Sequence, residues 1–192
     1  MYIEQGAQIV GAFPSATEGY DLAEPNEHTQ FQDFGHSHWK NSLIWGIGLE
    51  DITISGPGLI YGKGLTREES RLPGVGNKAI SLKLCKNVTL KDFSLLHCGH
   101  FGLLATGVDN LSILNVKVDT NRDGFDIDCC KNVRISHCTV NAPWDDAIVL
   151  KASYGLGYFK DTENVTISDC FVSGYDLSLI HISEPTRLGM IS

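Results

Sequence analysis

The sequence has few basic residues and no long apolar run. Its 15 lysines and arginines stand against 23 aspartates and glutamates, which gives a formal net charge of −8. An acidic chain without a basic stripe is not expected to bind nucleic acid. No run of about 18 apolar residues is present, so neither a transmembrane helix nor a membrane partner is predicted.

The sequence also lacks a clear metal or cofactor motif. The six cysteines do not show the paired spacing of a zinc site, and buried thiols are favoured over disulfides. His36 and His38 lie beside Trp39 in a loop-like stretch, but no third ligand follows at a matching spacing. Both histidines are therefore interpreted as surface or packing residues, and no metal or cofactor is predicted.

Two sets of short apolar segments recur along the chain without helical periodicity. Each segment of the first set begins with asparagine: residues 87–90, 110–113, 132–135 and 164–167, with starts 23, 22 and 32 residues apart. The second set lies between them at spacings of 23, 22 and 23 residues: 80–82, 103–105, 125–127 and 148–150. Such repetition of β-branched segments is typical of a solenoid.

These repeats predict an all-β fold, a right-handed parallel β-helix that is incomplete as a solenoid. Stacked turns would place the second set of segments in one parallel sheet. The recurring asparagines are expected to form a ladder of side-chain amides between turns, although three of them also match the glycosylation pattern. Extra residues at about 151–161 predict a loop whose aromatic side chains either stack on sugar rings or form a small apolar anchor: Tyr154, Tyr158 and Phe159.

Three aspartates occupy matching places on this repeat. Asp123 lies two residues before Phe125, and Asp146 lies two residues before Ile148. Adjacent strands are roughly 4.8 Å apart, so these two carboxylates should be near neighbours, with Asp145 beside them. Paired carboxylates of this kind suit acid/base hydrolysis of a glycosidic bond, and like charges this close should raise one pKa.

The segment 121–126, followed by the Asp145–Asp146 pair and Lys151, resembles glycoside hydrolase family 28, the polygalacturonase-like enzymes. The resemblance covers roughly residues 40–176. Arg122 stands where the family pattern usually has threonine, which leaves the acids of the motif intact. The resemblance implies an O-glycosyl hydrolase that acts on pectic or related polysaccharides containing uronic acids.

The same resemblance implies roles for individual residues. Asp145 would be the general acid, while Asp123 and Asp146 would hold and activate the attacking water in a reaction that inverts the anomeric centre. Further substrate-binding candidates are Asn121, Arg122, Asp126, Lys151 and His100. His100 would either line the same groove one turn further or pack inside the fold. Arg122 and Lys151 would either meet a substrate carboxylate or balance the local negative charge. Strand alternation predicts that Asp126 points outward into a substrate groove.

Two other classes stay open on the sequence. A pectate-lyase-like β-helix would cleave uronates by elimination and would use the acids as calcium ligands. A non-catalytic β-helix would bind glycan without turnover, but then the matched acids would have no evident use. Chelator sensitivity and an unsaturated product would identify the lyase.

The segment 177–192 breaks the repeat and resembles the translation of a transposon-type sequencing-library adapter. We therefore expect residues 1–176 to form a partial β-helix catalytic domain and 177–192 to be a non-native tail. The family's later histidine and basic clamp are not found, so the chain as printed is expected to be inactive. No signal peptide is seen, and the resemblance implies a secreted or periplasmic, monomeric parent.

Overall fold

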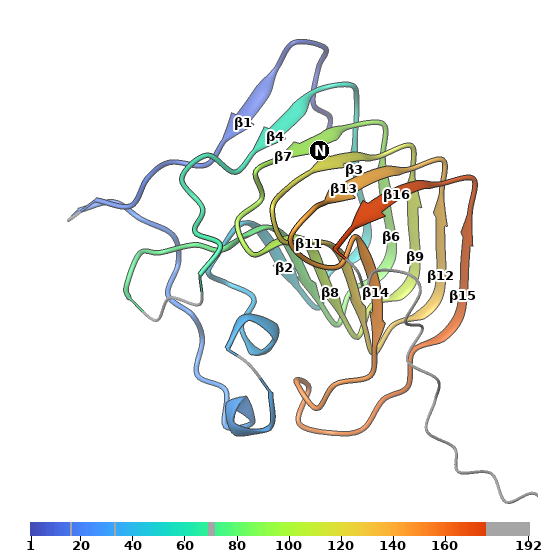
Figure 1. Cartoon of the computed structure of the whole chain (residues 1–192). Helices are drawn as coiled ribbons and strands as arrows, with labels where there is room; N and C mark the ends of the chain where they lie inside the picture. The colour runs from blue at the N-terminus through green and yellow to red at the C-terminus, as the bar shows by residue number, and fades with distance from the viewer. Residues whose placement is uncertain (16, 33, 69–71, 176–192) are drawn as a thin grey trace, which may run out of the picture.

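The computed structural model describes residues 1–15, 17–32, 34–68 and 72–175. Strands that lie three apart in the sequence pair in parallel, so the chain winds through three sheets in turn (Figure 1). The first sheet contains β1 (Gln8–Val10), β4 (Leu59–Tyr61), β7 (Ser94–Leu96), β10 (Lys117–Asp119), β13 (Thr139–Ala142) and β16 (Phe171–Gly174). The second contains β2 (Ser42–Ile47), β5 (Lys78–Lys83), β8 (Phe101–Thr106), β11 (Asp123–Asp128) and β14 (Ile148–Lys151). The third contains β3 (Glu50–Ser55), β6 (Lys86–Lys91), β9 (Asp109–Leu114), β12 (Lys131–Ser136) and β15 (Glu163–Ser168).

This winding confirms the predicted all-β parallel β-helix. The second set of repeated segments forms one parallel sheet, in which Ile80 pairs with Leu103, Leu103 with Phe125, and Phe125 with Ile148. The expectation for residues 177–192 lies outside the described residues. None of the helices in the described part is long and apolar enough to cross a membrane.

The core runs along the axis of the coil because equivalent positions of every turn point inward. Phe125 and Ile127 belong to it, with exposed fractions of 1% and 0%, as do Leu103 and Val133. All six cysteines are free thiols, and five of them are buried, in agreement with the prediction of structural thiols. Stacking turns thus bury apolar faces that no single turn could bury alone.

The predicted asparagine ladder is present at one corner of the coil. Each amide Nδ2 donates to the oxygen of the preceding turn at 2.8–3.0 Å: Asn87 to Asp51, Asn110 to Asn87, Asn132 to Asn110 and Asn164 to Asn132. All five residues also adopt positive φ, between 53° and 60°. Asparagine and aspartate tolerate this left-handed conformation better than other non-glycine residues, so one residue type both makes the turn and links the turns.

Replacing Asn110 by alanine tests this double role. The variant loses one donated and one accepted side-chain bond and places alanine at φ 60°. We expect the free energy of unfolding to fall by about 1–3 kcal/mol. Asn110→Gly is the matched control, because glycine removes the bonds without the conformational cost. In denaturant unfolding, wild type should be the most stable protein, Asn110→Gly intermediate and Asn110→Ala the least stable. Equal stability of all three proteins would contradict the ladder's role.

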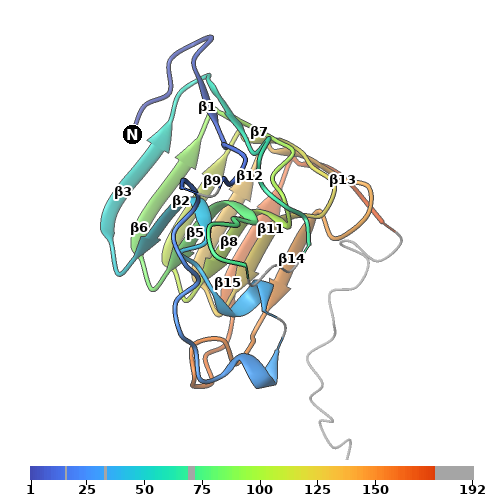
Figure 2. The same ribbon diagram turned by 90° about the vertical axis from the view of Figure 1, so that its left-hand side faces the viewer.

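The N-terminal segment folds back over the outer face of the second sheet (Figure 2). It carries two short 3₁₀ helices, η1 (Thr29–Phe31) and η2 (Gly35–Ser37). Trp39 is fully buried there and donates from Nε1 to Thr106 Oγ1 at 3.0 Å. The Lys83 ammonium lies 3.7 Å from the centroid of the Trp39 ring. The second sheet is therefore covered on both faces along this segment.

The predicted insertion is the loop between β14 and β15, and it lies beside η1 in both ribbon views (Figures 1 and 2). The Tyr154 ring contacts Phe31 and Phe159 at centroid distances of 5.2 and 5.1 Å. Asn26 Nδ2 also donates to the Gly155 carbonyl at 3.3 Å. The loop thus has an aromatic anchor, although Phe159 itself is 90% exposed.

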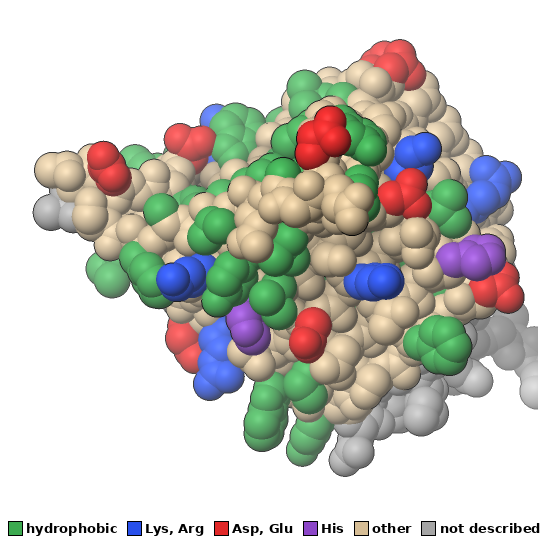
Figure 3. Space-filling model, turned by 90° about the horizontal axis from the view of Figure 1, so that it is seen from above, with side chains coloured by type: hydrophobic (Ala, Val, Ile, Leu, Met, Phe, Trp, Pro, Cys, Tyr) green, Lys and Arg blue, Asp and Glu red, His purple; other side chains and the backbone are tan. Residues whose placement is uncertain are grey.

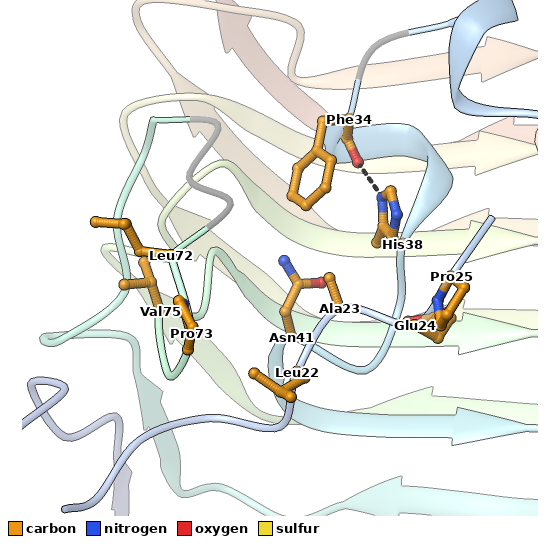
Figure 4. A pocket seen from close by; sticks show the side chains of 10 residues that line it. All are labelled: Leu22, Ala23, Glu24, Pro25, Phe34, His38, Asn41, Leu72, Pro73 and Val75. Carbon is orange, nitrogen blue, oxygen red and sulfur yellow. Dashed lines mark hydrogen bonds between the residues drawn. The ribbon is translucent and has the colours of Figure 1, made fainter. Parts of the chain in front are cut away.

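A cavity of about 280 Å³ lies between the N-terminal segment and the excursion near residues 72–75 (Figure 4). Its lining is mainly apolar and includes Leu22, Leu72 and Val75, but none of the three aspartates predicted to be catalytic. On the face seen in Figure 3, acidic and basic side chains are interspersed and form no basic stripe, as the acidic composition predicts.

Candidate active site

The three aspartates come together where two adjacent turns of the coil enter the second sheet. Asp123 begins β11, while Asp145 and Asp146 lie in the turn between β13 and β14. The Gly124 N–H donates to the Asp146 carbonyl at 2.9 Å, which continues the parallel register that pairs Phe125 with Ile148. One carboxylate oxygen of each aspartate lies within 4.8 Å of the others.

Gly124 is required for this close approach. A Cβ atom at position 124 would lie 2.3 Å from the Ala147 carbonyl oxygen and 2.4 Å from Val140 Cγ1. Any larger residue would push the two turns apart. The glycine that follows Asp123 in the motif is therefore needed for packing, because it allows the two turns that carry the acids to stack.

Asp123 is the least accessible of the three acids, with 4% of its surface exposed. Burial, followed by the charges of Asp126 and Asp145, raises the pKa of Asp123 to about 8. Its Oδ1 atom is buried without a hydrogen-bond partner among the described residues. At neutral pH the cluster thus holds one proton on Asp123, as expected for carboxylates crowded in one place.

Asp145 is more accessible and is paired with Arg122. The Nε and Nη2 atoms of Arg122 contact Asp145 Oδ2 at 2.8 and 2.7 Å, with 35% and 27% of the two side chains exposed. The Asp146 N–H donates to Asp145 Oδ1 at 3.1 Å. Both oxygens of Asp145 therefore accept hydrogen bonds, which fixes the orientation of this carboxylate.

Asp126 differs from the expectation of an outward residue in an open groove. It does point away from the core, but the N-terminal segment covers it and its exposed fraction is 0%. His36 Nε2 lies 2.8 Å and Lys151 Nζ 3.1 Å from Asp126 Oδ2. Burial alone would raise the pKa of Asp126, but the hydrogen bond from His36 and the charge of Lys151 outweigh it, so the pKa lies below its ordinary value.

His36 is the residue of this region whose contacts the sequence did not reveal. The packing alternative offered for it is the one observed, since it is buried on η2 against a partner 90 residues away in the sequence. His36, Asp123 and Asp126 each offer an atom within 4.8 Å of the others, so His36 closes one side of the acid cluster. The sequence showed only a histidine pair in a loop. A loop outside the repeat has no fixed position against the sheets, so the partner of His36 could not be predicted.

The remaining candidates occupy different places. His100 is 2% exposed, and its ring stacks on Phe101 with centroids 4.4 Å apart, so it lies inside the molecule beside the cluster. Asn121 is half-buried in the turn before β11. Lys151 ends β14 and contacts both His36 and Asp126. The structure thus places Lys151 at Asp126 and packs His100 against Phe101.

A groove of about 430 Å³ opens beside Asp145. It is lined by Arg67, Glu68, Arg122, Trp144 and Asp145. Trp144 is 66% exposed, so its ring is available to an apolar face of a ligand. The lining thus holds two arginines, one indole and two carboxylates, and the arginines and the indole suit an anionic sugar.

Two overlapping sets of side chains have the donor types of a cation site: His36, Asp123 and Asp126, and the three clustered aspartates. Calcium takes roughly 6–8 oxygen ligands, more than either set offers. The guanidinium of Arg122 already contacts Asp145, and the Lys151 ammonium lies at Asp126. The charges of the site are thus partly balanced by the chain's own cations.

Residues 38–184 match the family described as "Right handed beta helix region". A polygalacturonase from Juniperus ashei is 28% identical over 148 residues, which are 68% of this chain and 27% of that protein. A second polygalacturonase, from Chamaecyparis obtusa, is 27% identical over 161 residues, which are 74% of this chain and 30% of that protein. This chain therefore spans less than a third of the length of these curated relatives.

Among solved structures, the fold is similar to that of a Parabacteroides merdae protein that carries the name "putative glycosyl hydrolase", with a TM-score of 0.62. The two share 18% identity, and the match covers 88% of this chain and 70% of that one. Three parallel sheets wound in one coil, the stacked core and the family match over residues 38–184 agree with one another. The chain belongs to the right-handed β-helix family.

Proposed function

We propose that this chain is the acid-bearing part of a glycosidase that hydrolyses pectic or related polysaccharides containing uronic acids. The observation that carries the proposal is the meeting of Asp123, Asp145 and Asp146 from adjacent turns, with one oxygen of each within 4.8 Å of the others. The likeness to two polygalacturonases supports the choice of substrate class. Paired carboxylates in different environments are the standard means of cleaving a glycosidic bond.

Asp145 acts as the general acid, because it is the acid that lines the open groove. Asp123 and Asp146 hold the attacking water. Oxygens up to 4.8 Å apart can both bond one water at about 2.8 Å, so a single water fits between these two carboxylates. Asp123 in its ionised form accepts the water's proton while Asp145 protonates the leaving oxygen.

The resemblance to polygalacturonases implies inversion at the anomeric carbon. Inverting enzymes ordinarily hold their two carboxyl groups about 6.5–9.5 Å apart, and retaining enzymes about 5–5.5 Å. The nearest oxygens here are within 4.8 Å, which taken alone is closer to the retaining spacing. We nevertheless propose inversion, because Asp123 and Asp146 would bind the attacking water together, and neither would then act as a nucleophile. The stereochemical outcome is thus a sharp test of the mechanism.

Several local cations suit an anionic sugar on a chain whose net charge is −8. Arg67 and Arg122 line the groove, and Trp144 offers an exposed ring. The Lys151 ammonium lies 3.1 Å from the buried carboxylate of Asp126. A uronate carboxylate would therefore meet arginine rather than Lys151 in this groove.

We further propose that residues 177–192 are non-native and that activity belongs to a chain in which native sequence follows Asp176. We refer to that longer chain as the extended enzyme. Its later turns would supply the histidine and basic clamp that the family resemblance implies. We also propose a secreted or periplasmic monomer, on the same resemblance.

The experiment that tests this proposal is hydrolysis of polygalacturonate by the extended enzyme and by the printed chain, each with and without a chelator. The extended enzyme should release reducing ends without absorbance from an unsaturated product, and the chelator should change nothing. The printed chain should be slower by orders of magnitude, because positioning of the substrate can account for several kcal/mol of a barrier. No release of reducing ends by the extended enzyme would contradict the proposal.

Calcium-dependent elimination is the second candidate, and the two clusters of potential ligands around Asp123 favour it. In that reaction the acids would hold the cation that binds the uronate, and a basic residue would remove a proton. Loss of activity on chelation, together with an unsaturated product, would identify this reaction in the same assay.

A further inference from the structure

Arg122 stands between the groove and the general acid. Its guanidinium holds Asp145 Oδ2 through two nitrogens, at 2.8 and 2.7 Å, while its side chain remains 35% exposed to the groove. A guanidinium forms its strongest contacts with ionised carboxylates, and a carboxylate in such a pair has no proton to donate. Without substrate, the Arg122 guanidinium thus engages Asp145, the residue that must act as an acid.

The proton of the cluster resides elsewhere. Burial, with the charges of Asp126 and Asp145, places it on Asp123, whose pKa is raised to about 8. One turnover leaves this same distribution, because Asp145 gives a proton to the leaving oxygen and Asp123 takes one from the water. The enzyme at rest therefore resembles the enzyme just after hydrolysis, and one proton must return from Asp123 to Asp145 before the next cycle.

We propose that Arg122 is a specificity-determining residue: a substrate carboxylate in the groove draws its guanidinium away from Asp145, and one proton then passes from Asp123 to Asp145. This inference rests on the proposed function. The transfer balances, since a neutral Asp123 and an ionised Asp145 become an ionised Asp123 and a neutral Asp145. The substrate's negative charge replaces that of Asp145 beside Arg122, and the charge of Lys151 is the positive neighbour that favours the newly ionised Asp123.

The surroundings of the two carboxyl groups are compatible with this exchange. Asp126 and Asp145 act on Asp123 as negative neighbours, and Lys151 acts as a positive one. Asp146 and His36 complete the near shell. Arg67 and Glu68 line the same groove as Asp145. Of these groups, Arg122 is the cation in direct contact with Asp145 and open to the groove.

The consequence is selectivity that acts on the chemical step as well as on binding. A neutral sugar in the groove would leave Arg122 on Asp145 and the proton on Asp123. It would thus occupy the site without an acid in place, and its kcat would be low. A uronate would both bind Arg122 and allow the proton to reach Asp145. A carboxylate beside the scissile bond would therefore raise kcat and lower KM.

The first test needs no substrate and uses the printed chain. Carbon-13 NMR of the aspartate carboxyls reports the protonation of Asp123 and Asp145 between pH 4 and 9, with signals assigned through aspartate-to-asparagine variants. In Arg122→Gln, and equally in Arg122→Met, the protonated fraction of Asp145 at pH 6 should rise several-fold over wild type. Arg122→Lys keeps the charge but not the contact through two nitrogens, so its protonated fraction of Asp145 should lie between those of wild type and the neutral variants. The control is Arg134→Gln, an exposed arginine on β12.

An unchanged protonated fraction of Asp145 in both neutral variants would overturn the proposal, provided that circular dichroism shows the wild-type fold. The second test compares polygalacturonate with fully methyl-esterified pectin, the same polymer with its carboxylates neutralised, in the extended enzyme. The ratio of kcat on the two substrates should fall by at least about 10-fold in Arg122→Gln. An equal ratio in variant and wild type would also overturn it. If wild type cleaves neither polymer, the proposed function fails, and the NMR titration alone decides the role of Arg122.

Discussion

Asp145→Asn in the extended enzyme is expected to lower kcat on polygalacturonate by about 10²- to 10⁴-fold, the usual contribution of a general acid or base. Asparagine keeps the size of the side chain, and its one oxygen can accept from either Arg122 or the Asp146 N–H. One of these two bonds is lost, but both lie at the surface of the groove, so the fold should persist. The loss should fall mainly on kcat, because a missing proton donor affects the transition state more than the bound substrate.

Two comparisons make this result specific. Asp161→Asn changes an exposed aspartate in the loop before β15 and should leave turnover unchanged. Replacing the leaving sugar by a good leaving group that needs no proton should restore much of the rate of Asp145→Asn but not of Asp146→Asn. A decrease of less than about 10-fold in Asp145→Asn on the natural polymer would remove Asp145 from the acid role.

Asp123→Asn is expected to stabilise the fold at pH 8 while it abolishes activity. The folded-state pKa of Asp123 is raised to about 8, whereas an unfolded aspartate titrates near about 3.9. Between these values the native state holds a proton that the unfolded state has released, so stability falls as pH rises from about 4 to 8. Each pKa unit corresponds to about 1.4 kcal/mol, so the effect at pH 8 should reach several kcal/mol.

The measurement is denaturant unfolding of the printed chain at pH 4.5 and pH 8. Wild type should lose stability over this interval, and Asp123→Asn should lose much less of it. At pH 4.5 the two proteins should be closer in stability, since this pH lies just above the pKa of an unfolded aspartate and little of the pH-dependent loss has accumulated. Asp161→Asn should follow wild type at both pH values. Parallel pH profiles for wild type and Asp123→Asn would show that burial does not hold Asp123 protonated.

The sequence predicted the regular part of the fold because stacked turns require the same kind of residue at each equivalent position. Asparagine at positive φ, bonded to the turn before it, is one solution to a corner that recurs on every turn. The spacing of Phe125 and Ile148 also fixed the register of Asp123 and Asp146. These features are local and periodic, so they can be found without knowing which distant segments meet.

The cover of the second sheet could not be predicted in the same way. The N-terminal segment is mostly polar, is interrupted by Pro14 and Pro25, and has no period that assigns it to a face. Its contact between His36 and Asp126 joins residues 90 apart, and only the folded chain reveals it. For that reason Asp126 was expected in a groove, whereas it is buried. The pairing of Arg122 with Asp145 was equally hidden, since the sequence left open whether Arg122 meets substrate or balances charge.

The stereochemistry of the first product tests the central claim most directly. Proton NMR of the extended enzyme acting on an α-linked oligogalacturonate records the anomer of the new reducing end before mutarotation. The account predicts the β anomer, because Asp123 and Asp146 direct water to the face opposite the leaving oxygen that Asp145 protonates. An α anomer formed first would make one of these carboxylates a nucleophile, and an unsaturated product would replace hydrolysis by elimination. Either result would contradict the account.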